Sequence, residues 1–248
     1  MPVIDFNCDL GEGTGNDEAI MPFISSASIA CGYHAGDEAT MKTTVALCKK
    51  YNVAIGAHPS FPDKENFGRT NMQLPADEIY DMVCRQIELL IEIAYQQDKR
   101  LQHVKPHGAL YNMAAKDMVI ANAIAKSVKD CNESLLLFGL PGSKMEMAAK
   151  NYGLSFIGEA FADRTYQRDG SLTPRTATNA LIEDEAQSIA QVLQLVNHKI
   201  ITAINGDVIN INAKTICLHS DGKQAVQFAE ALHGTLISKG ITIQSFNS

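Results

Sequence analysis

The stretch VIDFNCDLGEG, residues 3–13, decides how this chain is expected to fold. On an extended strand successive side chains point to opposite faces, so Asp5, Asn7 and Asp9 share one face and apolar residues share the other. A buried carboxylate without a partner loses much of its hydration energy, so this polar face needs partners or a reaction chamber. This polar face can form a structural ion pair with Lys105, can belong to a reactive site, or can do both. In the combined case Asp5 supports the strand, and Asp9, which lies nearest the strand end, takes part in the reaction.

Two later segments repeat this alternation of ionisable side chains. The alternating residues are His103, Lys105 and His107 in residues 101–107, and Cys217, His219 and Asp221 in residues 215–221. Strands that carry ionisable groups on one face, and that are separated by helices, indicate a sheet or barrel that lines a site.

The rest of the chain alternates between strand-like and helix-like segments. Strands are expected at residues 3–9, 28–31, 53–57, 101–105, 135–138, 155–159 and 215–218, with helical segments between most of them. The Asn205-Gly206 pair predicts an added β-hairpin between residues 200–204 and 208–211, and residues 241–243 suit an edge strand. Two long loops, residues 60–74 and 160–178, are typical of functional loops.

Repeated strand–helix units predict parallel strands with right-handed crossovers, either in an open doubly wound sheet or in a closed barrel. An open sheet gathers its ligand at one switch point, whereas a barrel brings every strand end to one mouth. Ionisable groups follow the ends of six strands here, which favours a seven-stranded parallel (β/α) barrel. The length suits a single barrel domain over residues 1–248.

Composition excludes several classes of partner. The net charge of −7 argues against nucleic acid and against anionic membrane surfaces. We expect no membrane-spanning segment and no signal peptide, because Asp5 and Asp9 interrupt the apolar run at the start of the chain. Six scattered cysteines without C-x-x-C spacing indicate reduced thiols and a cytoplasmic protein.

The groups at the expected mouth define the candidate site. Each histidine or acid alone would suit a structural role, but their occurrence at corresponding points of six strand units favours one shared site. The set is Asp9, Glu12, His34, His58, Lys105, His107, Glu159, Asp163, Arg164, His219 and Asp221, with Asn7 on the inward face of the first strand.

Two kinds of chemistry remain open for this set. Carboxylates and imidazoles can hold a divalent metal, and Asp9, His58 and His107 are the candidate ligands, although their spacing matches no short metal motif. The same residue types can act as general acids and bases.

Arginines in the second long loop indicate binding of an anion. Arg164 and Arg175, with Lys105 and Arg69, suit a substrate carboxylate or a nucleotide phosphate. Alternatively, Asp–Arg pairs only hold the loop. The sequence has no G-x-x-x-x-G-K-[ST] phosphate loop.

Seven segments, in order, resemble the LamB/YcsF family, and together they extend from residue 4 to about residue 240. They are NCDLGEG (7–13), IACGYHAGD (29–37), GAHPSFPD (56–63), FGR (67–69), VKPHGALYN (104–112), EAFADRTY (159–166) and ICLHSD (216–221). Ser220 stands where the family usually has glycine, which affects only the local loop.

The resemblance implies a (β/α) barrel of the glycoside hydrolase/deacetylase type. It also implies ATP-dependent hydrolysis of 5-oxo-L-proline to L-glutamate by an A-type subunit together with B and C subunits, with ATP as cofactor and Mg²⁺ accompanying it. The expected catalytic residues are Asp9, Lys105, His107, Glu159 and His219. The expected substrate- or phosphate-binding residues are Asn7, Glu12, His34, His58, Arg69, Asp163, Arg164, Arg175 and Asp221.

Within this reaction Asp9 is the first choice for the base that activates water, with His107 or His219 as alternatives. Two other functions compete with it. One is a metal-dependent deacetylase or amidohydrolase acting on a carbohydrate-like substrate, and the other is a non-catalytic regulatory subunit that binds a small acid.

Overall fold

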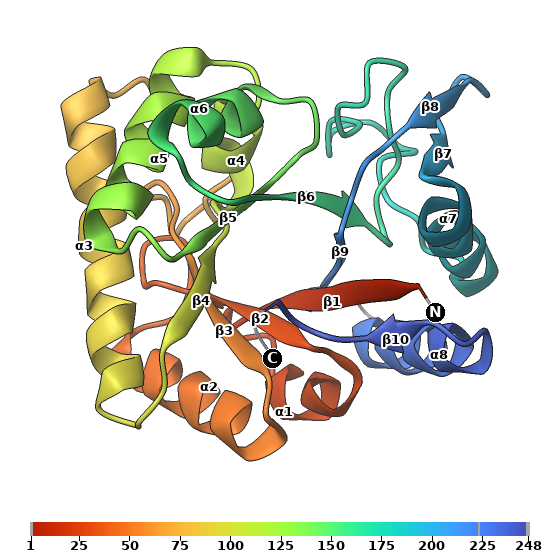
Figure 1. The fold of residues 1–248 in the computed structure, drawn as a ribbon, viewed down its shortest axis with the longest axis horizontal. Coiled ribbons are helices and arrows are strands. Elements are labelled where there is room, and N and C mark those ends of the chain that lie inside the picture. Colours follow the sequence, from red (N-terminus) through yellow and green to blue (C-terminus); the bar gives the residue numbers. More distant parts are fainter. Residues whose placement is uncertain (1, 223, 247–248) are drawn as a thin grey trace.

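A computed structural model describes residues 2–222 and 224–246, and among these residues seven parallel strands close into a ring. The ring strands are β1 (Val3–Leu10), β2 (Ser26–Ala30), β3 (Ala54–His58), β4 (Leu101–Val104), β5 (Leu136–Gly139), β6 (Phe156–Phe161) and β9 (Thr215–His219). Each pairs with the next in this order, and β9 pairs back with β1, as Figure 1 shows. The predicted barrel is therefore confirmed and the open sheet is excluded.

In the described part of the chain, three short strands lie outside the ring. β10 (Thr242–Ile243) pairs in parallel with the start of β1, as expected for an edge strand. β7 (Ile200–Thr202) and β8 (Val208–Asn210) form a separate antiparallel hairpin, which confirms the predicted addition to the barrel.

Helices cover the outside of the ring (Figure 1). They are α1 (Asp17–Ile20), a 3₁₀ turn (Met21–Phe23), α2 (Glu38–Tyr51), α3 (Ala76–Tyr95), α4 (Gly108–Ala114), α5 (Met118–Cys131), α6 (Lys144–Tyr152), α7 (Glu185–His198) and α8 (Ala225–Ser238). Side chains of Asp37, Asp117 and Asp184 cap α2, α5 and α7 by accepting backbone N–H bonds. The short helix α4 was not expected, and it begins directly after His107.

The hydrophobic core lies between ring and helices, whereas the inside of the ring is largely polar. In the register of the barrel, Asp9 lies level with Ser28 on β2 and with His219 on β9. Further down, the His103 ring stacks on Phe138 with centroids 4.1 Å apart. Gly56 makes room for it, because a Cβ there would lie 2.1 Å from His103 Nε2.

Among the described residues, no helix is both long and apolar enough to cross a membrane. The six cysteines are free thiols, as the scattered spacing predicted.

Candidate active site

A buried lysine connects four ring strands at the centre of the barrel. Lys105 Nζ lies 2.6 Å from Oδ1 of Asp9 and 2.9 Å from Oε1 of Glu159. It also donates hydrogen bonds to Asn7 Oδ1 and to Cys217 Sγ, each over 3.1 Å. Burial alone would lower the pKa of Lys105, but attraction to Asp9 and its neighbours raises the pKa well above its usual value. The ammonium is therefore a permanent cation.

Asp9 is correspondingly a permanent anion. Burial by itself would raise the pKa of its carboxyl, but His58 and Lys105 outweigh this effect and hold the pKa well below its usual value. The nearby Cys217 thiol behaves in the opposite way, because burial raises its pKa well above the ordinary range. Cys217 thus stays a neutral thiol, in agreement with the reduced thiols expected from the sequence.

The ion pair expected between the carboxylate face of β1 and Lys105 is formed by Asp9, whereas Asp5 has other partners. Its carboxylate instead accepts hydrogen bonds from the hydroxyls of Ser25 (2.7 Å), Ser26 (2.6 Å) and Thr215. Burial raises the pKa of Asp5 to about 6. Asp5 is thus a supporting residue below the site, and Lys105 pairs with the two carboxylates above it.

Four buried side chains gather where β1 to β4 end, namely Glu12, His34, His58 and His107. Their ligand-type atoms lie within 4.8 Å of one another. Burial lowers the pKa of His34 to about 2 and lowers the pKa of His107 well below its usual value. Burial also raises the pKa of Glu12 well above its usual value. The imidazoles of His34 and His107 are therefore neutral.

Gly68 in the first long loop permits this close packing. Its φ of +66° lies in the left-handed region, and an added Cβ would lie 2.8 Å from His34 Cβ and 2.9 Å from His107 Cδ2. The loop also supplies the Phe67 carbonyl, which accepts a hydrogen bond from His107 Nε2 at 2.9 Å.

On the opposite side of Asp9, His219 and Asp163 form a hydrogen-bonded pair. His219 Nδ1 lies 2.9 and 2.8 Å from the two oxygens of Asp163, whose Oδ2 also accepts the backbone N–H of His219. Burial would raise the pKa of Asp163, but His219 outweighs it and keeps the pKa below its usual value. The ionised carboxylate accepts a hydrogen bond from Nδ1, so the lone pair of His219 lies on Nε2, 4.0 Å from Asp9 Oδ2.

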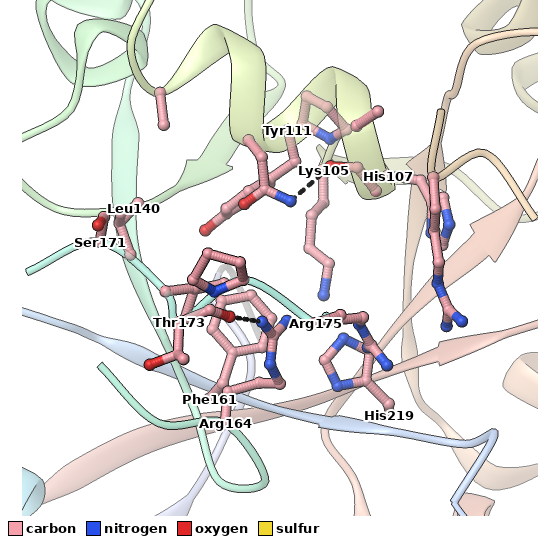
Figure 2. A pocket seen from close by; sticks show the side chains of 18 of the residues that line it. Lys105, His107, Tyr111, Leu140, Phe161, Arg164, Ser171, Thr173, Arg175 and His219 are labelled. Carbon is pink, nitrogen blue, oxygen red and sulfur yellow. Dashed lines mark hydrogen bonds between the residues drawn. The ribbon is translucent and has the colours of Figure 1, made fainter. Parts of the chain in front are cut away.

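A cavity of about 550 Å³ opens above these groups. Figure 2 shows the side chains of Lys105, Tyr111, Arg164 and His219 around it. Arg164 is held in place by donating from Nη2 to the Thr173 carbonyl over 2.6 Å. The cavity is thus lined by cations from the second long loop and by the Asp9–Lys105 pair.

The structure brings most of the predicted site together. Eight predicted residues line the cavity, namely Asp9, His58, Arg69, Lys105, His107, Arg164, Arg175 and His219. Asn7, Glu12, His34 and Glu159 are buried behind these residues and bond to them or to one another. Asp163 and Asp221 line an adjoining cavity with His219, and Asp221 accepts a 2.7 Å bond from Arg69.

Several lining residues were not predicted, including Tyr111, Asn112, Lys116, Phe161 and Thr173. Tyr111 and Asn112 belong to the VKPHGALYN segment, so the signal was present, but without the helix α4 their direction could not be deduced. The ring of Phe161 stacks on His219 with centroids 5.4 Å apart and lies beside the Lys105 ammonium.

The closed ring of seven parallel strands with surrounding helices is the fold of the deacetylase-like (β/α) barrels. The polysaccharide deacetylase Bc1974 from Bacillus cereus shares this fold with a TM-score of 0.51 at 15% identity, over 100% of this chain and 93% of the other. At this level of identity the likeness concerns the fold alone.

The chain belongs to the LamB/YcsF family, whose sequence model matches residues 4–248. It is 51% identical over 249 residues to the A subunit of 5-oxoprolinase from Bacillus cereus strain AH187, covering 98% of each chain. A crystal structure of a lactam utilization protein from Thermus thermophilus matches with a TM-score of 0.92 at 37% identity, over 98% of this chain and all of the other.

Proposed function

We propose that this chain is the A subunit of an ATP-dependent 5-oxoprolinase. It would hydrolyse the lactam of 5-oxo-L-proline (pyroglutamate) to L-glutamate, with ADP and phosphate as the other products, together with B and C subunits. The observation that carries the proposal is the likeness of nearly the whole chain to proteins named as the A subunit of 5-oxoprolinase. The lactam utilization protein with the same fold supports hydrolysis of a cyclic amide.

The cavity suits a small anionic substrate. Its volume of about 550 Å³ lies in the range of small-molecule sites. Arg164 and Arg175 line it, and either guanidinium can bind the carboxylate of 5-oxoproline through two parallel hydrogen bonds. A neutral acetylated sugar offers no group that needs these cations, which favours the lactam over a carbohydrate substrate.

Two groups at the bottom of the cavity can activate water. Asp9 is ionised but, because its pKa is depressed, it is a weak base. His219 has its Nε2 lone pair free, because Asp163 holds the proton on Nδ1. The geometry therefore favours His219 as the group that takes the proton from water, with Asp9, 4.0 Å from Nε2, orienting that water. This assignment moves the base from Asp9, the first choice from sequence, to one of its alternatives.

Positive groups surround the position where negative charge develops when water attacks the amide carbon. Lys105 and Arg164 line the cavity, and both are fixed by hydrogen bonds before any substrate binds. Preorganised donors of this kind stabilise an oxyanion without the cost of reorganisation.

ATP also fits the charges of this cavity, although the chain has no phosphate loop. Arg69, Lys116, Arg164 and Arg175 line the cavity and can bind phosphate oxygens, with Mg²⁺ bound to the nucleotide. Bound ATP would supply the phosphoryl group that activates the amide oxygen. Water would then add to the ring carbon, the C–N bond would break with a proton passing to the nitrogen, and hydrolysis of the remaining acyl phosphate would release glutamate and phosphate.

The proposal is tested by measuring glutamate formed from 5-oxoproline and ATP, first with this chain alone and then in a mixture with B- and C-type subunits. We expect turnover only in the complete mixture with ATP. Activity on N-acetylated sugars without ATP would instead establish a deacetylase. Binding of 5-oxoproline without turnover in the complete mixture would establish a regulatory role, and either result would overturn the proposal.

A further inference from the structure

The hydrogen bonds of His58 fix which of its nitrogens carries a proton. Nδ1 lies 2.7 Å from the backbone carbonyl oxygen of Lys105. A carbonyl oxygen only accepts hydrogen bonds, so Nδ1 carries a proton and Nε2 is the nitrogen left to bind a further proton or a metal cation. Nε2 is the atom that faces the other members of the histidine cluster.

His107 is oriented in the opposite sense by the same kind of contact. Its Nε2 lies 2.9 Å from the carbonyl oxygen of Phe67, so Nε2 carries the proton and Nδ1 the lone pair. His107 Nδ1 and His58 Nε2 are only 2.8 Å apart. Two lone pairs at this distance repel each other unless a proton or a metal cation lies against both.

Glu12 places a carboxyl oxygen at the same point. Its Oε1 lies 3.5 Å from His107 Nδ1 and 4.0 Å from His58 Nε2. The three separations, 2.8 to 4.0 Å, bracket the separation of about 3.3 Å between ligand atoms that bind zinc tetrahedrally.

We propose that Glu12, His58 and His107 bind a divalent transition-metal ion of the zinc class. Two neutral imidazoles and one carboxylate are the ligand set that such ions prefer, and both imidazoles have carbonyl partners that hold their lone pairs toward the ion. Three protein ligands leave one coordination position open for water or substrate.

His34 orients Glu12 in this arrangement and does not bind the ion. Its ring is stacked on His107, with centroids 3.7 Å apart and planes inclined by 4°. Two parallel stacked rings cannot both direct in-plane lone pairs at one ion. His34 Nε2 lies instead 3.1 Å from Glu12 Oε1, and its Nδ1 lies 2.9 Å from the Ser60 hydroxyl.

This site differs from the set expected from sequence, in which Asp9 was the carboxylate ligand. That set stays a prediction. Asp9 Oδ2 lies 3.4 Å from His58 Nε2, but Asp9 Oδ1 is 2.6 Å from the Lys105 ammonium, so one of its two oxygens already has a cationic partner. The two assignments make opposite predictions for variants of Glu12 and Asp9.

The test uses the full chain without an affinity tag, freed of metal by a chelator, incubated with Zn²⁺ and passed through a desalting column. Metal analysis should find about one Zn²⁺ per wild-type chain, because ligand sets of this kind bind zinc tightly. Glu12→Gln and His107→Gln should weaken zinc binding by at least roughly tenfold. His198→Gln, at the exposed end of α7, should retain the wild-type amount.

Far-ultraviolet circular dichroism of each variant in chelator shows whether the variant is folded. If His107→Gln is not folded, the isosteric variant Glu12→Gln still tests the site. Added Zn²⁺ should raise the melting temperature of wild type and of Asp9→Asn, but not of Glu12→Gln. Three results would overturn the proposal: no zinc retained by wild type, equal retention by all variants, or loss of zinc in Asp9→Asn with retention in Glu12→Gln. None of these measurements requires turnover, so the outcome does not depend on the proposed function.

Discussion

The ammonium of Lys105 lies 2.6 Å from a carboxylate oxygen of Asp9, with both side chains shielded from solvent inside the barrel. This pair links β1 to the end of β4 across the ring. Each buried charge loses the favourable free energy of its hydration, and attraction to the opposite charge offsets this loss. Neither charge is therefore stable in the barrel without its partner. The pair therefore contributes both to the stability of the barrel and to the charge of the cavity.

Replacing Lys105 by methionine should lower the free energy of unfolding by about 3–5 kcal/mol, because it leaves Asp9 and Glu159 as uncompensated buried carboxylates. Urea denaturation at neutral pH measures the change. Lys126→Met removes an exposed partner of Asp130 on α5 and should change stability little. Equal stability of the two variants would show that the central ion pair does not hold the barrel.

Asp9→Asn should reduce turnover by roughly 10²–10⁴-fold, because the water loses an orienting carboxylate and Lys105 loses its closest counter-charge. The chain should stay folded, since Glu159 still pairs with Lys105. Glutamate release by the complete enzyme and circular dichroism check both statements. Near-normal turnover would remove Asp9 from the mechanism.

Asp163→Asn should lower kcat by roughly 10²-fold or more while changing KM little. An asparagine amide can donate to His219 Nδ1, which places the ring proton on Nε2 and removes the lone pair that faces the cavity. Steady-state kinetics of the complete enzyme separates the two constants. Asp81→Asn, on the exposed face of α3, is the matched control. A change confined to KM would instead indicate that Asp163 binds substrate.

Asp5 makes the stability of the protein dependent on pH. Its pKa is raised by burial from 3.8 to about 6, so the folded state holds this proton more tightly than the unfolded chain does. Its contribution is most favourable below pH 3.8 and is lost as the pH rises toward 6, a change of about 3 kcal/mol. Asp5→Asn cannot titrate, so its stability relative to wild type should increase between pH 4 and pH 7. Denaturation curves of the variant and of wild type at the two pH values measure this change. A difference in free energy of unfolding between the two proteins that is the same at pH 4 and at pH 7 would contradict the prediction.

Gly68→Ala should destabilise the histidine cluster. The added methyl would press on His34 and His107 in a backbone conformation that already disfavours a side chain, and we expect a loss of about 2–4 kcal/mol. Gly153→Ala is the matched control, because Gly153 has a φ of +67° and an added Cβ there would meet no atom within 4 Å. It should lose only about 1–2 kcal/mol from backbone strain. Equal losses, measured by thermal unfolding, would show that the methyl group finds room at Gly68.

Many features of the barrel could be predicted from alternation along the strands. Asp5, Asn7 and Asp9 had to share one face of their strand. Six strand ends carried ionisable groups, and in a closed ring all of these groups lie at the same end of the barrel. The partners of these groups could not be predicted. An ion pair between the polar face of the first strand and Lys105 was expected, but only the barrel shows that Asp9 and Glu159 contact the lysine while Asp5 contacts three hydroxyls.

The sequence by itself determined which side chains face inward, because the two-residue period of a strand is a local property of the backbone. It also determined the family, through seven motifs spread over nearly the whole chain. Only the tertiary structure decided which inward groups are neighbours, because the relative height of strands such as β1 and β9 depends on hydrogen bonds between residues more than 200 positions apart. That register sets Asp9 beside His219, and the helix α4 that follows His107 brings Tyr111 to the cavity.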